Sequence, residues 1–324
     1  MDSATFALLN RRTKLRLEIP SPDDERRIVT SLGMIDDIEQ SAAELRRVAC
    51  ARAAAIRAGA ASSDDGSDDD LLLDDATDDA QVVWVSTLPV AGSIGGKIWD
   101  ASLLMSAWIR QAAREEALER RLPPPTRMLE LGAGLGIVGL AAAQTFPSAR
   151  VTLSDYDPEV VANLRQNVLL NYPEVPAAAE GAAPACSRID VAAIDFREFT
   201  REHGVGDADC LTKYAGLYGA FDMILGSDVV YELGHCHLAN VCLSLLARRA
   251  PTDEGNPPCA IFLLPDSRPR LRDFVTALAD AGLSCRIERV QPTSEMMRHL
   301  RHTHEGWGAG GASFSLYFVR RMAP

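Results

Sequence analysis

The chain beyond residue 81 alternates short apolar runs with longer segments of helical spacing. The apolar runs have the length of strands and are bounded by turn residues. They fall at residues 128–131, 150–155, 189–194, 221–226, 260–264, 284–290 and 312–320. Helical patterns occur at residues 158–171, 238–248 and 269–281. The alternation predicts an α/β fold with a seven-stranded, mostly parallel sheet and helices on both of its faces.

The last two apolar runs, at residues 284–290 and 312–320, have no helical pattern between them. A parallel connection within a sheet usually needs a crossover helix. We therefore expect the seventh strand to be antiparallel, which the symmetrical halves of dinucleotide dehydrogenases would not show.

The most informative local pattern is RMLELGAGLGIVGL, at residues 127–140. It places Gly132, Gly134 and Gly136 between the first strand and a segment with an apolar helical face. Glycines allow a sharp turn and leave no β-carbon between the backbone and a ligand. The unpaired N–H groups of the following helix would point back at the same place. The pattern predicts the site of a nucleotide-like cofactor.

Two acidic residues refine the identity of this cofactor. Asp155 ends the next strand, where doubly wound sheets bind their ligands and where an acid commonly holds ribose hydroxyls. Asp155 or Asp157 could instead cap the helix at residues 158–171. Glu130 lies two positions before the first glycine, which suits a ligand with a cationic amino-acid tail better than a pyrophosphate. S-adenosylmethionine is such a ligand.

The region before residue 81 differs in composition. Residues 26–58 carry apolar side chains at helical spacing, and residues 62–80 contain nine aspartates and no basic residue. A run of like charges repels itself and buries little apolar surface, which is typical of disordered linkers. We expect a largely helical N-terminal extension at residues 1–61, an acidic disordered linker at residues 62–80 and a catalytic domain at residues 81–324.

Composition restricts the setting of the protein. A net charge of −12 argues against a nucleic-acid surface, although most of it comes from the acidic run. The seven cysteines lack paired metal-ligand spacing, and His299, His302 and His304 continue into a glycine-rich loop, so we expect no metal. No secretory leader and no bilayer-spanning apolar run is visible. We expect a cytoplasmic or nuclear monomer that meets no membrane and holds its thiols reduced.

Four blocks of the sequence resemble a known family. They are GGKIWDASLLMSAWI, LELGAGLGIVGL, LSDYDPEVVANLRQNVLLN and FDMILGSDVVYE, in that order. In these blocks the chain resembles the seven-β-strand, class I S-adenosylmethionine methyltransferases, which have a Rossmann-like fold. More narrowly, it is similar to methyltransferase family 16, a group of protein-lysine methyltransferases. The likeness covers residues 82–321, and the extra segments at residues 172–187, 201–220 and 293–311 depart from it.

The resemblance implies roles for individual residues. Trp99, Glu130, Gly132 and Gly134 would lie near the methionine end of the cofactor and Asp155 at its ribose, while Asp195 and Phe196 would lie near its adenine. The cofactor-binding residues implied are thus Trp99, Glu130, Gly132, Gly134, Asp155, Asp195, Phe196 and Ser227.

The same resemblance makes Asp228 and Tyr231 the catalytic pair that borders the channel of the methyl acceptor. Asp228 is better interpreted as an orienting group than as an obligatory base, since a charged carboxylate beside an amine favours the ammonium form. Tyr231 can form an aromatic wall against the aliphatic part or the cation of the acceptor. Without the resemblance, a helix cap and a core aromatic residue would explain the two positions.

The leading hypothesis is a methyltransferase that modifies a lysine side chain of a protein substrate. A small-molecule or protein-arginine acceptor stays open, as do a nucleotide-dependent oxidoreductase and a catalytically silent binding module. Adenine N-methylation fits less well, because residues 228–231 read DVVY and lack the two prolines of the D-P-P-Y type motif.

Overall fold

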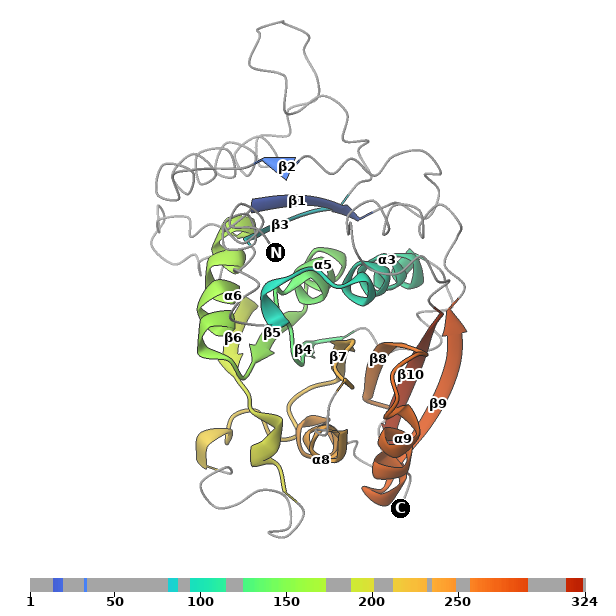
Figure 1. Ribbon diagram of the computed structural model, residues 1–324. Coiled ribbons are helices and arrows are strands. Elements are labelled where there is room, and N and C mark those ends of the chain that lie inside the picture. The colour runs from blue at the N-terminus through green and yellow to red at the C-terminus, as the bar shows by residue number, and fades with distance from the viewer. Residues whose placement is uncertain are drawn as a thin grey trace, which may run out of the picture.

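The structure is a computed structural model of the 324-residue chain, and Figure 1 shows it as a ribbon. It describes residues 14–19, 32–33, 81–86, 94–114, 125–172, 188–200, 212–231, 235–248, 257–290 and 313–322. The predicted acidic linker at residues 62–80 lies outside these ranges, as do the three clustered histidines.

A seven-stranded sheet forms the centre of the catalytic region. Its strands, in spatial order, are β6 (Ile189–Ala193), β5 (Arg150–Asp155), β4 (Arg127–Glu130), β7 (Met223–Ser227), β8 (Cys259–Pro265), β10 (Phe314–Arg321) and β9 (Leu283–Val290). Neighbours from β6 to β8 pair in parallel, whereas β10 pairs antiparallel with both β8 and β9. The predicted sheet and its antiparallel last strand are confirmed. The strand order reverses between β4 and β7, and ligands bind at the carboxyl ends of the strands at such a switch point.

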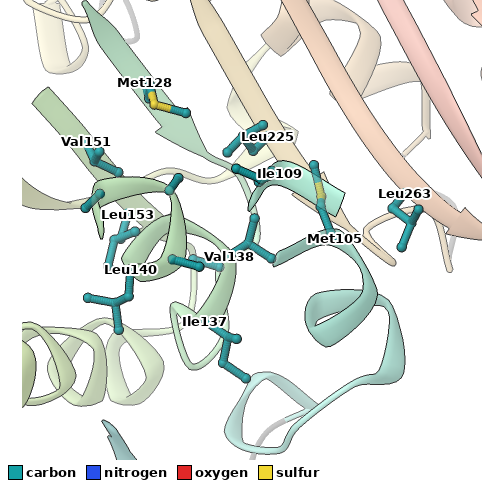
Figure 2. Packing of buried hydrophobic residues seen from close by; sticks show 14 of the residues in the cluster. Met105, Ile109, Met128, Ile137, Val138, Leu140, Val151, Leu153, Leu225 and Leu263 are labelled. Carbon is teal, nitrogen blue, oxygen red and sulfur yellow. The ribbon is translucent and has the colours of Figure 1, made fainter. Parts of the chain in front are cut away.

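Helices cover both faces of this sheet (Figure 1). One face carries α3 (Asp100–Arg114), α5 (Ile137–Thr145) and α6 (Pro158–Asn171), and the other carries α8 (His235–Leu245) and α9 (Leu271–Asp280). Because successive strand residues point to opposite faces, Ile261 and Leu263 join the first core while Phe262 and Leu264 join the second. Figure 2 shows the first core, in which residues of α3 and α5 pack on strand residues such as Met128 and Leu225.

A second, small sheet lies over the helices of the first face (Figure 1). It orders β2 (Leu32–Gly33), β1 (Lys14–Ile19) and β3 (Gln81–Ser86), and β1 pairs antiparallel with both neighbours. Val83 and Val85 of β3 are fully buried and belong to the first core, and β3 contacts α5 and α6. Strands β1 and β3 thus join the start of the chain to the beginning of the catalytic region.

In the N-terminal extension, the described residues 14–19 and 32–33 form strands, which the expectation of a largely helical segment did not include. In KLRLEI the apolar residues alternate with charged ones, which is the two-residue period of a strand. The expected helix at residues 26–58 lies outside the described residues, except at Leu32–Gly33, which form a strand. Within the described part of the chain, no helix has both the length and the apolar character needed to cross a membrane.

Phe274 of α9 provides a test of the second core. Its side chain is fully buried, and its ring centroid lies 5.6 Å from that of Phe262 and 6.3 Å from that of Tyr317. We expect Phe274→Ala to lower the free energy of unfolding by about 3–5 kcal/mol, because the cavity loses these contacts. Thr276→Ala, at an exposed position of the same helix, should change it by less than about 0.5 kcal/mol. Chemical denaturation measures both, and equal effects would contradict the assignment of Phe274 to the core.

Candidate functional site

The loop between β4 and α5 has the backbone conformation that only glycine adopts easily. Gly132, Gly134 and Gly136 have φ values of 60°, 55° and 80°, all in the left-handed region. Ala133 N–H donates to Ser154 O at 2.7 Å, which attaches the loop to β5. The loop therefore turns sharply at the carboxyl end of β4, as the sequence predicted.

Close packing explains why Gly134 has no side chain. A β-carbon at this position would lie 2.9 Å from the carbonyl oxygen of Gly95, which belongs to the short helix η2 (Ile94–Gly96). The sequence predicted that a ligand would occupy the space next to Gly134, but in the structure the backbone of Gly95 occupies it. The η2 segment thus lies directly on the glycine loop and brings Trp99, which follows it, to the site.

Asp155 fixes the other side of the loop. Its Oδ2 accepts a hydrogen bond from Gly134 N–H at 3.1 Å, and its Oδ1 accepts from Tyr156 N–H and Asp157 N–H at 2.8 and 3.2 Å. Burial raises the pKa of this carboxyl, although the backbone N–H groups oppose the increase. The helix cap of α6 is Asp157, whose carboxylate accepts from Glu159 N–H at 2.9 Å. Asp155 is therefore not used as a cap of α6 and lies at the carboxyl end of β5.

The side chain of Glu130 is buried against the first turn of α5. Its side chain is 1% exposed, and its Oε2 accepts a hydrogen bond from Gly139 N–H in the first turn of α5 at 2.8 Å. Burial raises the pKa of Glu130 to about 8, and the nearby Asp155 adds to the increase. In this position Glu130 supports the start of α5. Direct contact between Glu130 and the tail of a cofactor stays a prediction.

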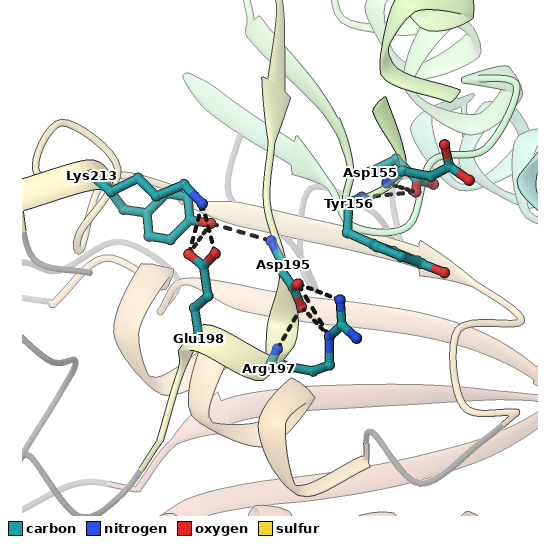
Figure 3. Close-up of polar contacts among 8 residues, drawn as sticks. Asp155, Tyr156, Asp195, Arg197, Glu198 and Lys213 are labelled. Atoms are coloured by element: carbon teal, nitrogen blue, oxygen red, sulfur yellow. Dashed lines mark hydrogen bonds and ion pairs between the residues drawn. The ribbon is translucent and has the colours of Figure 1, made fainter. Parts of the chain in front are cut away.

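Asp195 and Phe196 lie next to the glycine loop on the β6 side. The tip of the Phe196 ring is 3.9 Å from the position that a β-carbon of Gly132 would take. Asp195 caps the short helix η4 (Phe196–Glu198) by accepting from Arg197 N–H, and its carboxylate pairs with the Arg197 guanidinium at 2.7 Å. The hydrogen bonds from Arg197 hold the pKa of Asp195 below its usual value. Figure 3 shows this pair together with Asp155.

Residues that the sequence analysis did not single out hold this segment in place (Figure 3). Asp195 N–H donates to the Tyr214 hydroxyl at 3.3 Å, and that hydroxyl donates to Glu198 Oε2 at 2.7 Å. Lys213 Nζ pairs with the Glu198 carboxylate, also at 2.7 Å. Tyr214 and Lys213 belong to the segment at residues 201–220, for which the resemblance implied no role. Their contacts with Asp195 and Glu198 are visible only in the folded structure.

The predicted acceptor residues lie at the end of β7. Asp228 follows Ser227, the last residue of this strand, and has a φ of 52°, which is unusual for a residue with a side chain. Its N–H donates to Leu263 O of β8 at 3.0 Å. Its buried carboxylate accepts from Arg268 Nε at 2.7 Å and from Arg268 Nη2 at 2.5 Å. Tyr231 is 38% exposed, at the rim of this region.

Sequence reasoning missed Arg268. It lies in the loop after β8, and β8 is the parallel neighbour of β7. Once the strand order is known, a basic residue that follows the strand next to β7 is a candidate partner of Asp228, because both segments leave the sheet at the same edge.

Two cations, Lys97 and Arg268, lie close to the Trp99 ring. Its Nε1 donates to Ile94 O at 3.2 Å. Lys97 Nζ is 4.0 Å from the centroid of the Trp99 ring, and the guanidinium carbon of Arg268 is 6.0 Å from it. Burial lowers the pKa of Lys97, and the positive charge of Arg268 lowers it further.

The structure thus brings the two predicted groups of residues together at one edge of the sheet. A β-carbon at Gly132 would lie 2.9 Å from Val229 Cγ1, so the segment that carries Asp228 and Tyr231 packs directly on the glycine loop. In the described part of the chain, no cluster of three or more His, Cys, Asp or Glu residues could hold a metal ion.

Known proteins are similar in sequence to the region that contains the glycine loop. A family model described as lysine methyltransferase matches residues 79–181. A mouse protein-lysine N-methyltransferase, EEF2KMT, is 30% identical over 145 residues, which are 43% of this chain and 36% of the mouse protein. The match thus spans well under half of that relative's length.

Two further proteins are similar over longer stretches. A tRNA1(Val) (adenine(37)-N6)-methyltransferase of Vibrio campbellii is 27% identical over 211 residues, which are 64% of this chain and 74% of that protein. The solved structure of TrmN from Thermus thermophilus superposes with a TM-score of 0.39 at 18% identity, covering 68% of this chain and 49% of that one.

The buried Glu130 gives a prediction about stability and pH. Unfolding returns its pKa from about 8 to about 4.5, so the stabilisation from the bound proton is complete below pH 4.5 and is lost as the pH rises to about 8. Glu130→Gln removes this titration and keeps an oxygen for Gly139 N–H. We expect the variant to gain stability relative to the wild type as the pH rises through this window, by a few kcal/mol in order of magnitude.

Denaturant unfolding at a series of pH values measures this difference, with the exposed Glu159→Gln as the matched control. A stability difference between Glu130→Gln and the wild type that stays constant from about pH 5 to about pH 9 would contradict the burial of a protonated carboxyl.

Proposed function

We propose that this chain, which the lysine methyltransferase family model matches at residues 79–181, transfers a methyl group from S-adenosylmethionine to a lysine side chain of a protein. One observation supports this above all others. The Asp228–Tyr231 segment packs on the glycine loop through Val229 and Gly132, so a cofactor on the loop and an acceptor at Asp228 would be neighbours. Methyl transfer is an in-line displacement and needs this proximity.

The residues around the loop fit an adenosine-containing cofactor. Asp155 offers a carboxylate at the loop for the ribose hydroxyls, and the Phe196 ring beside Gly132 offers an apolar face for the adenine. Trp99 would lie at the methionine end, because the η2 segment before it packs on Gly134. The bound sulfonium would supply an electrophilic methyl group that requires no acid catalysis.

The acceptor amine has to arrive without its proton. Deprotonation of a lysine with an ordinary pKa of about 10.4 costs roughly 4–5 kcal/mol at pH 7. Removal from water lowers this cost, since desolvation disfavours the charged form. Asp228 and Tyr231 would orient the amine and its aliphatic stem at the rim of the site, where Tyr231 is partly exposed.

The similarity to the Vibrio tRNA methyltransferase makes an RNA adenine the alternative acceptor. Incubation of the protein with methyl-labelled S-adenosylmethionine and either hypomethylated cell protein or total RNA separates the two. After complete hydrolysis, we expect the label in methyl-lysine. Label in methyl-adenine or methyl-arginine would replace the proposed acceptor, and an absence of label in every fraction would overturn the enzymatic activity.

Asp228 should affect the acceptor more than the cofactor. We expect Asp228→Ala to lower kcat on the methylated protein by roughly 100-fold, because an orienting contact acts mainly in the transition state. The affinity for S-adenosylmethionine, measured by calorimetry, should change by less than about threefold. Asp280→Ala, at the exposed end of α9, is the control. Normal turnover of the variant, or equal losses of turnover and cofactor affinity, would contradict the assignment of Asp228 to the acceptor channel.

Tyr231 provides a graded test of the same channel. Tyr231→Phe keeps the aromatic ring and loses the hydroxyl, so it should be milder than Tyr231→Ala in single-turnover kinetics. Equal losses in the two variants would show that the hydroxyl, and not the ring, is the part of Tyr231 that acts.

A further inference from the structure

We propose that Arg268 is a positioning residue of the acceptor site, which holds the Asp228 carboxylate in one orientation and compensates its charge so that the site accepts an amine in its neutral form. This inference rests on the proposed lysine methylation. It assigns a role to a residue that lies 40 positions from Asp228 in the sequence and in a different loop.

The geometry of the pair suits orientation. The guanidinium binds both carboxylate oxygens, through Nε at 2.7 Å and through Nη2 at 2.5 Å. A bidentate fork fixes the plane of the carboxylate, which a lysine at this position could not do. The Asp228 side chain is 6% exposed and that of Arg268 is 26% exposed, so the pair is only weakly screened by water.

The backbone around Asp228 also needs a fixed partner. Asp228 has a left-handed φ of 52°, and its N–H is bound to Leu263 O. A strained backbone persists only where the surrounding contacts determine it. The Leu263 bond holds the main chain and the Arg268 fork holds the side chain, so both parts of the residue are fixed by β8 and the loop that follows it.

The charge of the pair matters for the chemistry. Asp228 alone would stabilise the ammonium form of an incoming lysine, because an opposite charge within hydrogen-bond reach raises the pKa of an amine. That effect opposes methyl transfer, which uses the lone pair of the nitrogen. With Arg268 bound, the two charges largely cancel, and Asp228 can still orient the acceptor through its remaining lone pairs.

Several titratable groups surround the pair. Tyr231 comes from the segment after β7, and its electrostatic influence reaches Arg268. Lys97 comes from the segment before α3, where it shares the Trp99 ring with Arg268, and Asp100 begins that helix. Asp266, in the loop that carries Arg268, accepts a hydrogen bond from Ser315 Oγ at 2.7 Å and is thereby directed toward β10.

Lys97 shows how this environment treats an amine. Its pKa is lowered first by burial and then by the charge of Arg268. The larger of these influences, desolvation, is one that a substrate amine would also meet in the site.

The test is the pH dependence of kcat for Arg268→Met and Asp228→Asn. The substrate is the protein that becomes methylated in the labelled extract, at saturating concentration, since kcat reports the ionisation of the bound state. Arg268→Met leaves the carboxylate uncompensated, so the pH of half-maximal kcat should rise by about one unit or more. Asp228→Asn leaves the guanidinium uncompensated, so this pH should fall.

Opposite shifts would separate an electrostatic role from a structural one, because mere loosening of the site lowers kcat in both variants without moving the two profiles apart. Arg268→Lys keeps the charge and loses the fork, so its profile should stay near that of the wild type while its kcat falls. Arg270→Met is the matched control, since Arg270 lies in the same loop and pairs with the exposed Asp273.

Circular dichroism and S-adenosylmethionine binding verify that each variant is folded. Should Arg268→Met fail to fold, the other two variants test the inference: the pH of half-maximal kcat should fall in Asp228→Asn and stay near the wild-type value in Arg268→Lys. Unchanged or parallel profiles would overturn the inference while the wild type still methylates lysine. Absence of methyl-lysine with the wild type would instead overturn the proposed function.

Discussion

The hydrogen bond between Gly134 N–H and the Asp155 carboxylate joins the two parallel strands at the centre of the site. It connects the loop after β4 to the end of β5 and keeps the loop in a left-handed turn. This turn leaves space for the backbone of Gly95, which packs on Gly134. Trp99 follows Gly95 in the sequence and therefore lies near the loop. Glu130 supports the same loop from below through Gly139. Because both carboxyl groups are buried, the loop is held by polar groups that water reaches poorly.

The acceptor side depends on the order of the strands. β7 and β8 are parallel neighbours, so the segments after them leave the sheet at the same edge. Asp228 and Arg268 therefore meet although they are 40 residues apart. We propose that their pairing lets the carboxylate direct an amine without stabilising its protonated form. The chemistry proposed for lysine requires this combination, since the nucleophile must be both oriented and neutral.

The sequence predicted the main sheet and its antiparallel last strand well, because RVTLSD has the length and alternation of a strand and CAIFLLP is apolar on both faces. It missed the small sheet of β1, β2 and β3. A six-residue strand such as KLRLEI is too short to outweigh the helical spacing that follows it, and its partner begins at Gln81, beyond the acidic run. A pairing over such a distance leaves no local trace in either segment.

Local pattern by itself predicted the glycine loop and the acid at the end of β5, because each is dictated by the backbone or by chemistry within a few residues. The motif at residues 228–231 was indicated only by the resemblance to a family. Tertiary structure alone decided what these groups touch. It placed Glu130 under α5, brought Tyr214 to Asp195 and closed the Arg268 fork on Asp228. These contacts join residues that are far apart in the sequence and follow no recurring spacing. The strand order brings the residues together, and the burial of their charges favours the contacts.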